Sequence, residues 1–162
     1  MFGSFHPLER TYIMTFSSDI KAFATKTNRN LDDVRAYSAI TLFTNIIMAT
    51  PVGNPDFWQG GGKAPAGYTG GRLRGNWQAS INTPENSTTK QIDPNGGKVL
   101  KDMTAKMLTV KGDESLFMTN NLPYAARIEY GHSRKQRPMG MVRVSIAAFE
   151  DAVKSALQKV DR

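Results

Sequence analysis

The segment that decides the fold is "NRNLDDVRAYSAITLFTNIIMATP", residues 28–51. Its apolar residues recur three and four positions apart, which places them on one face of an α-helix. Asn30 is suited to cap the start of this helix, and Pro51 is expected to end it. Because the apolar face is broad, we predict that this helix is the most buried one and forms the centre of the core. The residues of this face are Leu31, Val34, Tyr37, Ile40, Leu42, Phe43, Ile46 and Ile47.

The segments on either side of this helix predict an α+β fold. A separate helix is predicted before it from apolar residues at helical spacing, which are Ile13, Phe16, Ile20 and Phe23. Periodicity further predicts strands at 72–81 and 114–121 and helices at 98–110 and 142–160. This order favours a small, mainly antiparallel sheet packed against helices. Two strands alone form a marginal sheet, so we expect one or two more within 52–96, or completion of the sheet by a neighbouring subunit.

A long loop rich in glycine and proline is predicted at residues 51–71. It holds three prolines and seven glycines, which sustain neither a helix nor a central strand. Loops of this length inside a compact domain usually carry a function. We therefore expect the loop to contribute to a binding surface.

The length of 162 residues predicts a single domain, 1–162, with residues 1–10 as a mobile N-terminal arm. The chain has no cysteine, which excludes disulfides and thiolate chemistry. Its start lacks a basic region followed by an apolar stretch, so no signal peptide is expected. The most apolar stretch, residues 40–49, is too short to span a membrane, and no membrane association is expected.

The positive charge of the chain is concentrated in two segments. The formal net charge is +7, from 21 basic and 14 acidic residues. Residues 60–76 supply +3, and residues 127–143 supply +4. These segments are either solvated loops with uneven charge or two loops presented to an acidic surface.

The residues that resemble catalytic or ligand-binding motifs do not complete those motifs. His132 and Ser133 begin like a nucleophile elbow, but Lys135 stands where that turn needs glycine. Neither His6 nor His132 has neighbouring metal ligands. The run "QGGGKAP", 59–65, lacks the first glycine and the hydroxyl residue of a phosphate-binding loop. We therefore expect no catalytic residue, no cofactor and no metal, and predict that the protein is not an enzyme.

Nucleic-acid binding is a second hypothesis. Basic residues alternate with aromatic residues that are able to stack on bases, namely Trp58, Tyr68, Trp77, Tyr124 and Tyr130. Against this, no predicted helix carries a basic stripe or a recognition motif. Specific recognition of nucleic acid is therefore not expected, although a position beside DNA is compatible with the charge.

Two stretches of the chain resemble a known family. The first combines "ATPV", 49–52, with "TGGRLRGNW", 69–77, and the second is "TNNLPYAARIEYGHSRKQRPMGMVR", 119–143. Together with a C-terminal helix they resemble the neck or tail-completion proteins of long-tailed DNA bacteriophages, also called minor tail components. In that family the two halves of the first stretch are nearly contiguous, and aspartate is common where Gly53 stands here. Residues 54–68 therefore look like an insertion.

The resemblance implies a small α+β virion protein that joins a ring at the top of the tail and takes part in head-to-tail joining. It implies copies of the same chain in a ring, with six suspected, and contact with tail terminator, tail tube and head-connector proteins. The protein would lie in the neck of the virion, and in the host cytoplasm during assembly. The alternative functions are a nucleic-acid-binding accessory protein and a hydrolase that uses Ser133 and His132.

Arginine and aromatic residues are typical of protein interfaces, and both resembling stretches are rich in them. We expect both to lie on one contact surface, and we expect reversal of Arg72 and Arg74 to glutamate to block assembly while leaving the monomer folded. The predicted interface residues are Arg72, Arg74, Trp77, Tyr124, Glu129, Tyr130, His132, Arg134, Lys135 and Arg137.

Overall fold

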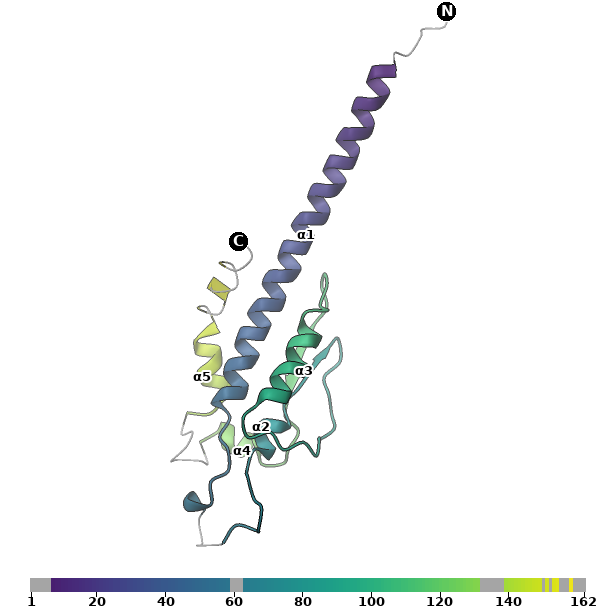
Figure 1. Cartoon of the computed structure of the whole chain (residues 1–162). Coiled ribbons are helices and arrows are strands. Elements are labelled where there is room, and N and C mark those ends of the chain that lie inside the picture. The colour runs from purple at the N-terminus through teal and green to yellow at the C-terminus, as the bar shows by residue number, and fades with distance from the viewer. Residues whose placement is uncertain are drawn as a thin grey trace, which may run out of the picture.

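The structure is a computed structural model that describes residues 7–58, 63–131, 139–149, 151, 153, 154 and 158; within the first range, side chains are described for 26, 27 and 29–58. Its elements are α1 (Pro7–Ala49), the 3-10 turn η1 (Pro55–Phe57), α2 (Arg72–Gly75), β1 (Gln78–Ile81), α3 (Gly97–Met107), β2 (Leu116–Thr119), α4 (Ala125–Glu129) and α5 (Val142–Ala147). The two strands form a small antiparallel sheet that packs against α3, and α3 in turn packs against α1, which confirms the predicted α+β class (Figure 1).

Helix α1 is a single continuous helix, whereas the sequence predicted two (Figure 1). The predicted cap Asn30 lies inside it, and the helix already begins at Pro7, within the expected N-terminal arm. The reason is the absence of glycine and proline between Pro7 and Pro51, since the intervening polar residues each cost a helix less than about 1 kcal/mol. The free end of α1 extends far beyond the rest of the chain (Figure 1).

The core lies around the C-terminal part of α1. Its buried positions begin at Ala36 among the described side chains, so the predicted apolar face is only partly buried, and Leu31 is 58% exposed. From Ala36 onward the helix does form the centre of the core, as predicted. The buried cluster comprises Ala39, Phe43, Ile46, Ile47, Leu73, Trp77, Val99, Met103, Met107, Leu122, Ala125 and Met141.

The sheet consists of β1 and β2, paired antiparallel with Gln78 opposite Thr119 and Ile81 opposite Leu116. The strand predicted at 114–121 is confirmed by β2, but that predicted at 72–81 is correct only for its second half. Residues Arg72–Gly75 form α2, because the four-residue spacing of Leu73 and Trp77 suits a helical turn as well as a strand. No further strand occurs among the described residues of 52–96, namely 52–58 and 63–96.

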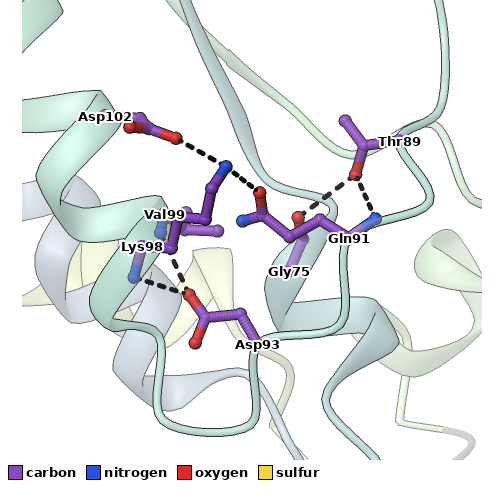
Figure 2. Close-up of polar contacts among 7 residues, drawn as sticks. All are labelled: Gly75, Thr89, Gln91, Asp93, Lys98, Val99 and Asp102. Atoms are coloured by element: carbon purple, nitrogen blue, oxygen red, sulfur yellow. Dashed lines mark hydrogen bonds and ion pairs between the residues drawn. The ribbon is translucent and has the colours of Figure 1, made fainter.

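Residues 89–93, which precede α3 in the chain, form hydrogen bonds to both α3 and α2 and so hold the two helices together. The Oδ2 atom of Asp93 accepts hydrogen bonds from the backbone N–H groups of Lys98 and Val99, at 2.9 and 3.0 Å, and so caps the helix start (Figure 2). The hydroxyl of Thr89 lies 3.3 Å from the carbonyl oxygen of Gly75 in α2 (Figure 2). Gly75 allows this approach, since a Cβ there would lie 2.6 Å from the carbonyl oxygen of Gln91.

Candidate protein-interaction surface

The first resembling stretch forms a buried junction between the end of α1 and α2. Thr50 is fully buried, and its Oγ1 donates to the carbonyl of Ile46 at 2.7 Å. The indole Nε1 of Trp77 donates to the same Oγ1 at 2.7 Å. Trp77 is 8% exposed and belongs to the core cluster. Trp77 therefore acts within the protein, where its ring packs in the core and its N–H holds the end of α1.

Arg74 caps the C-terminal end of α1. Its Nη2 and Nε donate to the carbonyl of Thr50 at 2.7 and 3.2 Å, and Nη2 also lies 3.3 Å from the carbonyl of Met48. Its Nη1 donates to the carbonyl of Pro94 at 2.5 Å. Carbonyls at a helix end have no intrahelical donor, so a guanidinium there stabilises the end directly. The charge predicted to face a partner is thus bound by backbone oxygens of its own chain.

Glu129, in the second stretch, joins α4 to α5. Its carboxylate accepts hydrogen bonds from the backbone N–H groups of Met141, Val142 and Arg143 at 2.7, 2.8 and 3.0 Å. The Nε of Arg143 lies 3.4 Å from the same carboxylate. Gly140 permits this arrangement, because its φ is +84° and a Cβ there would lie 2.4 Å from the carbonyl oxygen of Glu129. Glu129 therefore caps the start of α5.

These hydrogen bonds set the pKa of Glu129. Burial alone would raise this pKa, but the N–H groups of Val142, Arg143 and Met141 favour the carboxylate and, with the side chain of Arg143, lower it below its ordinary value. Because the folded-state pKa is depressed, the carboxylate contributes stability above the unfolded-state pKa. That contribution is lost as the pH falls through the folded-state pKa.

Replacing Glu129 with glutamine should therefore destabilise the protein most at neutral pH. We expect the free energy of unfolding to fall by about 1–3 kcal/mol at pH 7, and the difference from the wild type to shrink below about pH 4. Urea unfolding at both pH values measures this. Asp113→Asn is the control, since Asp113 is exposed and hydrogen-bonds to no described residue. A difference for Glu129→Gln that does not depend on pH would contradict the assigned cap.

The two ends of the long loop lie side by side. A Cβ on Gly70 would lie 2.6 Å from the carbonyl oxygen of Gly53, and one on Gly53 would lie 2.2 Å from the hydroxyl of Tyr68. Tyr68 also packs edge-on against Trp58, with ring centroids 5.2 Å apart. The loop thus begins and ends at one place on the body of the protein, where Gly53 lies next to Tyr68 and Gly70.

Excision of the loop should consequently leave the fold intact. When residues 54–69 are replaced by Gly-Ser-Gly, we expect the free energy of unfolding to change by no more than about 1 kcal/mol, because a shorter closed loop offsets the lost contacts of Tyr68. Thermal melting followed by circular dichroism tests this. Loss of the cooperative transition would mean that the loop is part of the core fold.

A pocket of about 200 Å³ lies where the loop rejoins the body. Arg72 and Tyr124, one from each resembling stretch, meet in this pocket beside Tyr68. Burial raises the pKa of Tyr124, and the positive charge of Arg72 opposes this rise. The lining residues are Pro51, Gly53, Tyr68, Gly71, Arg72, Leu73, Tyr124 and Ile128.

The predicted interface residues thus fall into three groups. Arg72 and Tyr124 share the pocket, and Tyr130 is 77% exposed, with the guanidinium of Arg143 5.4 Å from its ring centre. In a second set the polar groups form hydrogen bonds to other residues of the same chain; this set is Arg74, Trp77 and Glu129. A third set lies outside the described residues: His132, Arg134, Lys135 and Arg137.

Sequence reasoning did not assign Tyr68 or Arg143 to this surface. The sequence pattern suggests only base stacking for Tyr68, and the separation of Tyr68 and Tyr124 along the chain gives no signal that they lie close together. Arg143 belongs to the basic segment 127–143, and its position fourteen residues after Glu129 gives no signal that the two side chains pair.

No protein-family model matches the chain, and no match was found among curated proteins or solved structures. The described residues contain no group of three or more histidine, cysteine or acidic side chains arranged to hold a metal ion. In the same part of the chain, no helix has the length and apolar character needed to cross a membrane.

Proposed function

We propose that this chain is a structural component of the neck of a long-tailed bacteriophage, where copies of it form a ring that joins head to tail. The observation that carries the proposal is the way the two halves of the first resembling stretch are connected in space. Arg74 and Trp77 from one half of the first stretch bind Thr50 from the other half. The motif residues therefore form one folded unit, and the inserted loop lies outside it.

The exposed side chains around this unit support an interaction role. Five aromatic side chains are exposed on the loop and around α4, and Arg72 shares a pocket with two of them, Tyr68 and Tyr124. The five are Phe57, Trp58, Tyr68, Tyr124 and Tyr130. Large aromatic residues and arginine are the residue types that contribute most to protein interfaces. The loop and α4 lie at the end of the molecule opposite the free end of α1 (Figure 1). We take this end as the contact surface with neighbouring neck proteins.

Imaging of particles tests the neck role. The gene is deleted from the genome that encodes it, and the particles made are examined by electron microscopy, with a plasmid copy of the gene as the control. We expect filled heads separate from unjoined or malformed tails, and joined particles when the plasmid copy is present. Intact, infectious virions in the deletion strain would overturn the proposal.

The nucleic-acid-binding alternative makes a different prediction. Binding through phosphate contacts weakens steeply as the salt concentration rises, in proportion to the number of contacts. A neck component bound to proteins should show little affinity for DNA at physiological salt. Fluorescence anisotropy with a labelled duplex at two salt concentrations separates the two functions.

A further inference from the structure

The pocket beside the loop contains Arg72, a cation that has no partner among the described residues. The guanidinium of Arg72 makes no hydrogen bond or ion pair with any described residue. The hydroxyl groups of Tyr68 and Tyr124 likewise make no hydrogen bond to a described residue. None of the described residues that line the pocket is acidic. The rest of the lining is apolar, chiefly Pro51, Leu73 and Ile128. The site thus combines one positive charge, two phenols and an apolar floor.

Two acidic residues next to the pocket, Asp93 and Glu129, bind other groups. Asp93 adjoins it, since its N–H donates to the carbonyl of Gly71 at 3.2 Å, but its carboxylate caps α3. Glu129 follows Ile128 in the chain, but its carboxylate caps α5. Neither of these carboxylates pairs with Arg72, and Arg72 is exposed to solvent.

We propose that this pocket binds the carboxylate of an aspartate or glutamate side chain on a neighbouring protein. A guanidinium pairs with a carboxylate through two parallel N–H···O bonds, and the phenol hydroxyls of Tyr68 and Tyr124 are additional donors. The apolar floor suits the methylene groups of an acidic side chain. A phosphate group would gain more from several cations than from one, so a carboxylate is the better fit.

The identity of the protein that supplies the carboxylate rests on the proposed neck function, but the chemistry of the pocket does not. The probe is therefore the α-amide of N-acetylglutamate, which carries a single side-chain carboxylate. It is titrated into the purified full chain, labelled with ¹⁵N, and amide chemical shifts are followed by NMR. The corresponding glutamine compound is the neutral isostere, and inorganic phosphate is the competing anion.

We expect saturable shifts at Gly53, Gly71 and Leu73 with the glutamate probe, with a dissociation constant on the order of 10 mM. The glutamine compound should bind at least about tenfold more weakly, as should the glutamate probe to Arg72→Gln. Arg72→Lys, which keeps the charge but not the paired donors, should bind with intermediate affinity. Arg29→Gln is the matched control, since Arg29 is an exposed arginine on α1, outside the pocket.

The proposal would be overturned if the glutamate probe gave no saturable shift, if the two probes bound equally, or if phosphate bound more tightly. Unchanged affinity in Arg72→Gln would do the same. Amide shifts away from the pocket report whether each variant is folded, and Arg72→Lys serves if the glutamine variant is not. The titration uses the isolated protein and tests only the pocket, so a negative result does not bear on the neck role, which the particle images test. Likewise, evidence against the neck role would not contradict binding of a carboxylate in the pocket.

Discussion

Replacing Trp77 with alanine should lower the free energy of unfolding by about 4 kcal/mol and the melting temperature by roughly 10 °C. Two losses combine in this variant. The indole ring is buried in the core cluster, so its removal leaves a large cavity. Its Nε1 also donates to Thr50 Oγ1, which links α2 to the end of α1. Thermal and urea unfolding followed by circular dichroism measure the change without relying on tryptophan fluorescence.

The chain supplies its own control for this experiment. Trp58, the other tryptophan, lies after η1 on the loop, is 36% exposed and packs against Tyr68. Trp58→Ala should change the free energy of unfolding by less than about 1 kcal/mol. If both variants were equally destabilised, the loop would have to be part of the core. Near-neutral behaviour of Trp77→Ala would contradict the junction described above.

The parts of the fold that the sequence predicts well are those with a strong local period. Helix α3 shows apolar residues at helical spacing, and Val99, Met103 and Met107 are buried as that spacing requires. Strand β2 lies in a short segment bounded by turn residues. Helix α5 begins at Val142, as predicted, but it ends at Ala147, whereas the predicted helix runs to residue 160. For α3 the local pattern and the tertiary contacts agree, so the pattern alone suffices. For α5 they do not, since Ile146 and Phe149 of its predicted apolar face are exposed and Ser145 is buried.

The parts that were missed depend on contacts between distant residues. The four residues of α2 are held by Gly71, whose φ is +87°, and by the segment around Asp93, whose Pro94 would lie 2.4 Å from a Cβ on Gly71. The sequence of residues 72–81 gives no sign of the contact with the segment around Asp93. The alternation of polar and apolar residues therefore predicted a strand over the whole range. The boundary within α1 was wrong for a related reason. A capping residue marks a helix start only when the preceding residues leave the helix, and here they do not.

The interface residues were predicted from residue type, which does not show what each side chain contacts. The basic and aromatic residues of the two resembling stretches do meet, at Arg72 and Tyr124. However, residue type alone does not distinguish an arginine that faces solvent from one that caps a helix. Arg72 and Arg74 are two positions apart in the same short helix, and their guanidinium groups lie in different environments.

Because of this difference, the same substitution to glutamate should affect stability strongly at Arg74 and hardly at all at Arg72. Arg74→Glu should lower the free energy of unfolding by about 3–5 kcal/mol, because it removes hydrogen bonds to the carbonyls of Met48, Thr50 and Pro94 and brings a negative charge towards those oxygens. Arg72→Glu should change it by less than about 0.5 kcal/mol, because Arg72 has no described partner to lose. Urea unfolding of the two single variants at pH 7 is the measurement.

The expectation that reversal of both arginines leaves the monomer folded is therefore revised for Arg74. A double variant that failed to assemble would report unfolding and loss of contact together, whereas Arg72→Glu isolates the contact. We expect Arg72→Glu to remain as stable as the wild type and to be absent from purified particles when it replaces the natural chain. Equal stability losses in the two single variants would contradict the assigned cap. Normal incorporation of a folded Arg72→Glu protein would show that the pocket does not face a neighbour, because a reversed charge cannot pair with a carboxylate.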